Sequence, residues 1–316
     1  MSPSPEPDET AAGPVYEGRP LVRPEDEVVD QGAAFDMATL LTRRRVLSVV
    51  GIGAGALALA ACSSGGTSGT SSSSGSGSSD GTATTSDGEI PEETNGPYPA
   101  DGSNGVNVLE ESGIVRSDIT SSLDGGTTVE GVPLTFTFAV TDMANGDIPF
   151  EGVAVYAWQC DAQGRYSMYT EGVEDETYLR GIQVTDSNGE ATFQTIVPGC
   201  YTGRWTHIHF EVYPDAASAT NVENAIATSQ VAFPEDMLDE VYTLDTYPGS
   251  ADNLTQVSLA TDNVFSDGYD LQMGTFTGDP TSGYVGSLAV AVDTTTEPGL
   301  SQPPNGGTPP SGAPGQ

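Results

Sequence analysis

Apolar and polar residues alternate in several short runs between about residues 130 and 295. In the clearest run, Leu134, Phe136, Phe138 and Val140 take every second position, which is typical of a strand with one buried face. Further alternating or β-branched runs cover 153–158, 191–197, 205–213, 227–233 and 285–292. Turn-forming clusters such as Asn145-Gly146-Asp147 separate the runs. The pattern predicts an all-β domain, a sandwich or a barrel, with helices only near 216–226 or 234–242.

Other stretches carry no such alternation. Residues 1–41 are polar, acidic and rich in Pro and Gly, and we expect them to be disordered. Residues 62–88 are almost wholly Ser, Gly and Thr after Cys62, which is typical of a flexible linker. Residues 296–316 form a Pro/Gly-rich tail. One domain therefore remains, over about 89–295.

Residues 42–61 have the pattern of a targeting signal rather than of a structural element. Arg43-Arg44-Arg45 precede an apolar run of roughly 16 residues, shorter than the ~20 that a membrane span needs, which resembles a twin-arginine export signal. The run ends in Leu59-Ala60-Ala61-Cys62, which resembles a lipoprotein cleavage site with Cys62 as the lipid-modified residue. We expect a protein tethered to the outer face of the cytoplasmic membrane through this anchor. An uncleaved signal anchor is the alternative.

The charge of the chain excludes one class of partner. The formal net charge is −36, and all nine basic residues are arginines. After residue 62 only Arg116, Arg165, Arg180 and Arg204 remain, among 36 acidic residues. Such a chain repels phosphate, so nucleic-acid binding is excluded.

His207 and His209 are the only histidines of the sequence and are separated by one residue. On a strand they point to the same face, about 6.6–6.8 Å apart along it, and can reach one metal ion. Imidazole is the commonest metal-ligating side chain. Sites that need a third histidine are excluded, so other residue types must complete the metal site.

Four segments around this pair occur in an order that resembles a known family. They are Gly146–Tyr166, Arg180–Gly189, Phe193–Tyr201 and Arg204–Phe210. Together they closely resemble the intradiol ring-cleavage dioxygenases, the catechol and protocatechuate 3,4-dioxygenase family, over roughly residues 92–292. The resemblance implies a β-sandwich with long loops.

The resemblance implies a non-haem Fe(III) held by Tyr166, Tyr201, His207 and His209. The chemistry agrees, because Fe(III) is a hard ion that prefers anionic oxygen, and a phenol ionises readily when a cation binds it. The implied reaction cleaves a catechol-type aromatic diol with O2 to a cis,cis-muconate, outside the cell membrane. Two alternatives stay open, a non-catalytic surface-tethered sandwich that binds a partner and an iron-holding lipoprotein.

Further residues receive roles by the same resemblance. Arg204 would stabilise the anionic substrate, and strand parity requires it to lie in the loop before the histidine strand or beside a bulge. Gln230 would lie beside the substrate. Gly96, Pro97 and Tyr98 would line the pocket entrance. Arg165 and Arg204 are the cations near these residues in sequence, so a neutral and a carboxylated catechol both remain open as substrate, as does the oligomeric state.

Two cysteines follow Cys62. Cys160 and Cys200 each lie close to a predicted ligand in sequence. Outside the cytoplasm a disulfide between them would brace the site. Two buried free thiols are the alternative.

Overall fold

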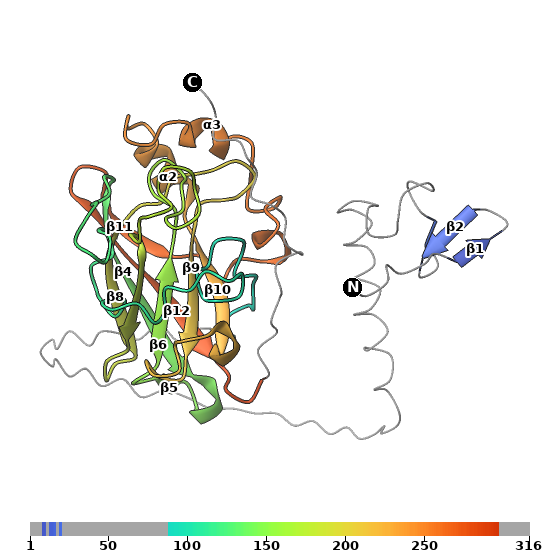
Figure 1. The fold of residues 1–316 in the computed structure, drawn as a ribbon, viewed down its shortest axis with the longest axis horizontal. Coiled ribbons are helices and arrows are strands. Elements are labelled where there is room, and N and C mark those ends of the chain that lie inside the picture. Colours follow the sequence, from blue (N-terminus) through green and yellow to red (C-terminus); the bar gives the residue numbers. More distant parts are fainter. Residues whose placement is uncertain (1–7, 11–12, 17–18, 21–87, 297–316) are drawn as a thin grey trace, which may run out of the picture. The chain divides into compact units, whose positions relative to one another are not determined.

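The computed structural model describes residues 8–10, 13–16, 19–20 and 88–296 (Figure 1). The export signal, Cys62, the linker up to residue 87 and the tail from residue 297 lie outside these ranges. The chain divides into two units, residues 1–77 and 78–316, and each is described by itself.

The first unit contains three short antiparallel strands. They are β1 (Asp8–Thr10), β2 (Gly13–Tyr16) and β3 (Arg19–Pro20), paired in that order. The residue types of Val15-Tyr16 favour extended backbone. The other residues of 1–41 lie outside the described ranges, and their disorder stays a prediction.

The second unit is a sandwich of two sheets. One sheet has the order β10-β9-β6-β7 and the other β11-β12-β4-β5, with β8 also paired to β4. β12 runs parallel to β4 and every other pair in these two sheets is antiparallel. The strands are β4 (Pro133–Asp142), β5 (Ile148–Pro149), β6 (Ala154–Trp158), β7 (Arg180–Val184), β8 (Glu190–Ile196), β9 (His207–Tyr213), β10 (Ala227–Ala232), β11 (Thr275–Asp279) and β12 (Gly283–Val292). The prediction of a β-sandwich is confirmed.

Helices are few and short in this unit. The α-helices are α2 (Glu235–Val241) and α3 (Ser250–Leu254), and the 3-10 turns are η2 (Met143–Asn145), η3 (Val222–Asn224) and η4 (Phe265–Asp267). The helix expected near 234–242 is therefore present, whereas 216–226 holds only η3. No helix among the described residues is long and apolar enough to cross a membrane.

Aromatic side chains fill the space between the two sheets. Phe136 and Phe138 alternate on β4 as the sequence predicts, and both are buried. The Phe138 ring lies 4.8 Å from the ring of Phe210 on the opposite sheet and 6.0 Å from that of Phe193 on β8. Aromatic pairs at such distances supply much of the burial that stabilises a sandwich.

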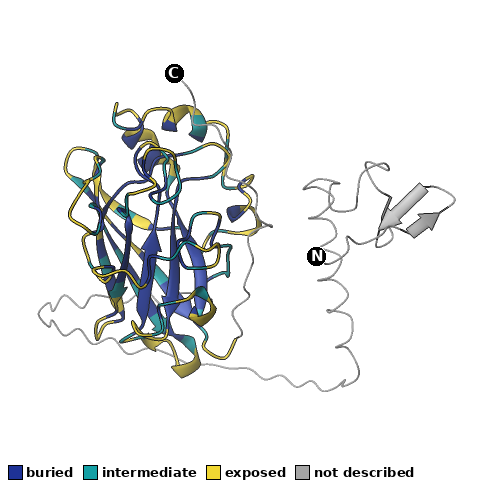
Figure 2. Cartoon of the chain, in the orientation of Figure 1, coloured by how far each residue is buried: buried dark blue, intermediate teal, exposed yellow. Residues whose placement is uncertain are grey.

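The four-stranded sheet is buried on both faces, which Figure 2 shows as dark blue strands. All seven residues of β9 are buried. Ile208, Phe210 and Val212 belong to the core between the sheets, and Tyr213 to a second core built with loop residues. That second core contains Ala100, Val108, Leu109 and Ile114, from the loop before β4, and Tyr156 and Trp158. His207 and His209 therefore project under a cover of loops rather than into solvent.

Three strands are not predicted by the alternation of apolar and polar residues. β5 has two residues, and β11 is a short and largely exposed edge strand. β7 begins with the buried Arg180, so its buried face does not read as apolar. The extended conformation of these strands therefore depends on pairing with neighbouring strands more than on their own sequence pattern.

Candidate metal centre

Four polar side chains meet beneath the loops that cover β9. Tyr166 lies in the loop after β6, Tyr201 in the loop before β9, and His207 and His209 on β9 itself. Nε2 of His207 lies 3.3 Å from each tyrosine oxygen and 3.1 Å from Nε2 of His209, and the two tyrosine oxygens are 3.5 Å apart. The structure thus brings together the four residues that sequence reasoning selected.

Packing fixes the direction of the His209 ring. The indole of Trp158, opposite His209 on β6, stacks on the imidazole with ring centroids 4.8 Å apart and 5° between planes. On the other side, a Cβ on Gly96 would lie 3.2 Å from Cε1 of His209, and Gly96 has a φ of +71°. Glycine is therefore needed here for both space and backbone conformation.

The segment after Gly96 also borders the centre. The Tyr98 ring lies 4.9 Å from the Tyr166 ring, whereas Pro97 is exposed. The fully buried Arg180 holds this segment by donating to the carbonyls of Tyr98 and Pro99 at 2.9 and 3.0 Å. The same guanidinium donates to the Ser167 carbonyl beside Tyr166, so it ties both loops to the sheet.

Both imidazoles are held in their neutral form. Burial, with the charge of Arg204 nearby, lowers the pKa of His207 to about 3. Burial and the neighbouring His207 lower the pKa of His209 well below its ordinary value. Nδ1 of His207 donates to the Trp205 carbonyl, which leaves Nε2 as a lone pair directed at the tyrosine oxygens.

Both phenols keep their protons while no cation is near. Burial raises the pKa of Tyr166 and of Tyr201 above that of a free phenol. A metal ion reverses this preference because it stabilises the phenolate directly. Two neutral imidazoles and two potential phenolates suit a hard, highly charged ion such as Fe(III). Among the described residues, no group of three or more His, Cys, Asp or Glu could hold a metal, so the tyrosine oxygens are needed.

Arg204 lies in the loop before β9, as strand parity requires, and is held by an aspartate that the sequence did not reveal. Asp262 accepts from Nε of Arg204 at 2.9 Å and from its Nη2 at 3.3 Å. The Asp262 carboxylate is fully buried, and it also accepts from the backbone N–H groups of Trp205, Val264 and Phe265. It thereby fixes the Arg204 side chain, of which 13% is exposed.

Gln230 occupies the position on β10 directly opposite His209. Its carbonyl oxygen accepts from Nη2 of Arg204 at 2.7 Å, and its amide donates to the Thr94 carbonyl at 2.9 Å. Arg204, Gln230 and the segment before Gly96 thus form one hydrogen-bonded side of the centre.

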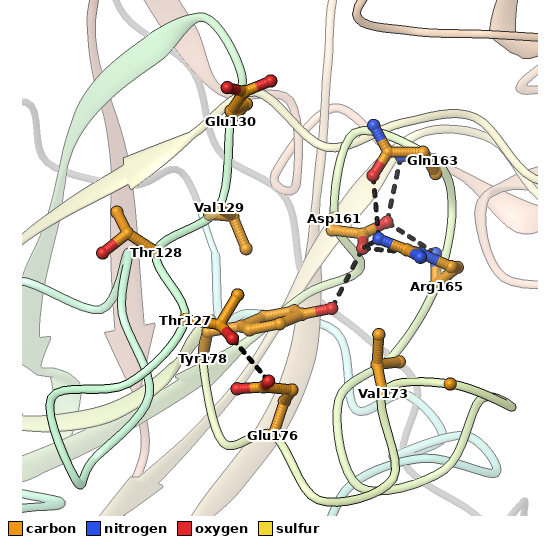
Figure 3. A pocket seen from close by; sticks show the side chains of 11 residues that line it. Thr127, Thr128, Val129, Glu130, Asp161, Gln163, Arg165, Val173, Glu176 and Tyr178 are labelled. Carbon is orange, nitrogen blue, oxygen red and sulfur yellow. Dashed lines mark hydrogen bonds and ion pairs between the residues drawn. The ribbon is translucent and has the colours of Figure 1, made fainter.

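Arg165 does not face the centre, although it precedes Tyr166. Its guanidinium pairs with the buried Asp161 at 2.7 Å. Figure 3 shows both residues at a separate cavity of about 370 Å³, lined also by Gln163, Glu176 and Tyr178. Neither histidine nor either predicted tyrosine ligand lines that cavity.

The disulfide between Cys160 and Cys200 is not formed. Both residues are free and buried. The Cys160 thiol donates to the Gly199 carbonyl, and the Cys200 thiol lies 3.6 Å from the Arg204 carbonyl. Burial raises the pKa of both thiols, that of Cys200 to about 11, so they remain protonated.

A pair of buried carboxyl groups lies under the loops beyond the histidines. Burial, followed by the nearby Asp101, raises the pKa of Glu211 well above its ordinary value. Glu211 is the next outward-facing residue after His209 on β9, and it accepts from the Tyr213 hydroxyl at 2.6 Å. Its raised pKa favours the neutral form, which adds no negative charge beside the candidate ligands.

Comparisons with known proteins relate the chain to dioxygenases. A family model described as Dioxygenase matches residues 109–243. An intradiol ring-cleavage dioxygenase from Tetranychus urticae has a similar structure, with a TM-score of 0.54 and 25% identity over 67% of this chain and 98% of that one. The search of curated proteins found no match.

Two further structures are more distant. The dioxygenase domain of a carbohydrate-binding fusion from Streptomyces sp. SirexAA-E has a TM-score of 0.42 and 24% identity, over 65% of this chain and 99% of that one. A 3-chlorocatechol 1,2-dioxygenase from Rhodococcus opacus 1CP has a TM-score of 0.36 and 18% identity, over 56% and 63%.

Replacing Asp262 with Asn should destabilise the protein by about 3 kcal/mol, because it leaves the largely buried Arg204 charge without its partner. Burial alone would raise the pKa of Asp262, but hydrogen bonds and charge from Arg204 outweigh it and lower that pKa below its ordinary value. The stabilisation should thus be complete above the unfolded pKa of about 4 and be lost only below it. Urea unfolding at pH 8, 6 and 5 measures it.

The matched control is Asp252→Asn, which removes an exposed carboxylate of α3. It should change the free energy of unfolding by less than about 0.5 kcal/mol. An Asp262→Asn effect that shrinks between pH 8 and pH 5 would contradict an ion pair held fully charged.

Proposed function

We propose that the chain is an intradiol ring-cleavage dioxygenase, as its relatives suggest. It would cleave a catechol with O2 at an Fe(III) held by Tyr166, Tyr201, His207 and His209. The bond broken joins the two hydroxyl-bearing ring carbons. Both oxygen atoms enter the product, a cis,cis-muconate. The convergence of two phenols and two neutral imidazoles within 3.5 Å carries the proposal.

When bound, Fe(III) supplies a Lewis acid that draws electron density from the catecholate and makes a ring carbon reactive toward O2. The residues of the chain supply binding, orientation and proton transfer. The His209 ring is clamped by Trp158, and the His207 ring by its bond to the Trp205 carbonyl. Second contacts of this kind fix the orientation of metal ligands.

The two tyrosines differ in exposure, and this divides their roles. Tyr166 is 1% exposed, and its backbone is fixed by the Thr170 hydroxyl. Tyr201 is only partly buried and lies at the edge of the centre. We assign to Tyr201 the exchangeable position, in which its phenolate oxygen takes a proton from the incoming diol.

Arg204 supplies positive charge where the substrate is anionic. Burial would lower the pKa of Arg204, but Tyr201, Asp262 and Tyr166 outweigh it and raise that pKa. The Nη2 of Arg204 donates to Gln230, the residue that pairs with His209. Its Nε and Nη2 are bonded to Asp262 and Gln230, and we assign Nη1 to the substrate. A fixed donor of this kind stabilises developing negative charge without reorganisation.

We expect the purified protein to bind close to one iron per chain and to show a visible tyrosinate-to-Fe(III) charge-transfer band. Anaerobic catechol should shift that band, and O2 should then yield one muconate per catechol. Metal analysis and absorption spectroscopy test this. A protein that stays colourless and iron-free after reconstitution would contradict the proposal and favour a non-catalytic binding protein. Coloured iron without turnover of any catechol would favour the iron-holding alternative.

Replacing Tyr201 with Phe should lower kcat much more than it lowers iron content, because three ligands remain while the proton acceptor is lost. We expect a loss of about 10²-fold or more in kcat, the range for removing a general base. Tyr284→Phe, on β12 in the other sheet, is the matched control and should leave both quantities unchanged. Loss of all iron in the Tyr201 variant would contradict an exchangeable role.

We also propose that the domain acts outside the cytoplasmic membrane, tethered by a lipid on Cys62. Arg43-Arg44 followed by an apolar run and Leu59-Ala60-Ala61-Cys62 support this. A Ser/Gly/Thr linker after Cys62 would hold an acidic domain away from an anionic lipid surface.

Replacing Cys62 with Ser should move the protein from the membrane fraction to the soluble fraction, because no lipid can then be attached. Fractionation with immunodetection measures this. Cys160→Ser is the control, since that thiol is buried in the domain and should not affect partition. Equal membrane retention of wild type and Cys62 variant would support the uncleaved signal anchor.

A further inference from the structure

Three of the four arginines of the domain are committed to protein groups, and the fourth, Arg204, lies at the diol end of the site, which restricts the substrate. We infer that the site accepts uncharged catechols and discriminates against catechols that carry a ring carboxylate. The inference rests on the proposed function and deepens it. The sequence leaves the substrate's charge open because Arg165 and Arg204 both stand near predicted ligands.

No arginine between residues 88 and 296 is available to a carboxylate on the substrate ring. These residues contain no lysine, and four arginines carry the positive charge. Arg165 pairs with Asp161 at the separate cavity shown in Figure 3. It therefore cannot serve as the counter-ion that its position beside Tyr166 suggests.

Arg116 and Arg180 are occupied by backbone carbonyls. Arg180 is fully buried and donates to the carbonyls of Tyr98, Pro99 and Ser167. Arg116 donates to the carbonyls of Arg180, Ser121 and Thr177 at 2.6–3.1 Å. Turning either side chain toward a substrate would leave several buried carbonyls without a donor, which is costly.

Arg204 alone faces the centre, and it lies at the wrong end for a ring carboxylate. Its Nη2 donates to Gln230, which pairs with His209, so the guanidinium lies on the side of the centre where the two hydroxyls of a diol would bind. A carboxylate para to one hydroxyl lies across the ring from that end. Arg204 is moreover paired with Asp262, and the donor that this pairing leaves is assigned to the diol oxygens rather than to a group across the ring.

The remaining charge near Arg204 is negative. Glu93 and Asp267 lie close enough to one another to interact, and Glu93 interacts with Arg204 and Asp262 as well. Burial, followed by Asp267, raises the pKa of Glu93 to about 7, so its carboxyl is ionised at pH 8. Asp262 pairs with Arg204, and Glu93 precedes Thr94, whose carbonyl accepts from the Gln230 amide beside Arg204. A carboxylated substrate would add a further negative charge on this side of the centre.

The test compares 3,4-dihydroxybenzamide with 3,4-dihydroxybenzoate, which have nearly the same shape but differ by one charge. Each is titrated anaerobically at pH 8 into the iron-loaded full chain, and the dissociation constant is read from the shift of the visible band. Catechol itself is titrated first. A protein with no band, or with no shift on adding catechol, fails the proposed function rather than this inference.

We expect the amide to bind at least about tenfold more tightly than the acid at low salt. Raising the ionic strength to 1 M should narrow the gap, because exposed charges are then screened within about 3 Å. Equal affinity for the two, exclusion of both, or tighter binding of the acid would overturn the inference.

A variant that removes the charge of Glu93 tests whether this residue causes the preference for the amide over the acid. Glu93→Gln should reduce the difference in dissociation constant between the acid and the amide, without weakening the binding of catechol. Glu151→Gln is the matched control, because Glu151 is exposed in the turn before β6. Trp158, which pairs with His209, lies at the other end of that strand. Equal narrowing in both variants would mean that only overall charge matters, which overturns the local argument.

Discussion

The rest of the structure depends on one constraint, which is that four uncharged polar side chains must be buried together with their polar atoms facing one another. The two imidazoles and two phenols of the centre meet within 3.5 Å, inside loops and stacked rings. Burial keeps the histidines neutral and the tyrosines protonated, so the cluster has no charge of its own. A cation at its middle converts this arrangement from a cost into a source of stability. The rest of the domain provides what such a cluster requires, a dry location and fixed directions.

The dry location comes from covering the outer face of the four-stranded sheet. A strand such as β9 normally has one face for the core and one for water, but here both faces are buried. The loops that form the cover have little apolar periodicity of their own. Arg180 fixes them through backbone carbonyls on two different loops, with a charged donor at each contact. The buried Arg180 therefore holds the covering loops on the sheet through hydrogen bonds, where a simpler sandwich would use the packing of a hydrophobic strand.

The sequence predicted those parts in which local pattern and final environment agree. Leu134 to Val140 alternate and are buried alternately, and His-Ile-His places both rings on one face wherever the strand pairs. Asp262 was out of reach because it is one acidic residue among many, 58 positions after Arg204, and only the fold joins them. Arg165 was expected near the centre because it precedes Tyr166 in sequence. In the structure its side chain instead pairs with Asp161, away from the centre. The thiols of Cys160 and Cys200 each find a carbonyl nearby, a choice that spacing cannot reveal.

The parallel pairing of β12 with β4 gives the domain a particular order of assembly. β4 is the first strand of the sandwich and β12 the last, yet they lie side by side over nine residue pairs, from Tyr284–Leu134 to Val292–Asp142. Until residue 292 has left the ribosome, β4 has an open edge and the aromatic core has an open side. Contacts between residues so distant in sequence form slowly, because a long loop must close first. The four candidate ligand residues are all made earlier in synthesis, yet the sheet that packs against theirs is complete only when the last strand has paired with the first.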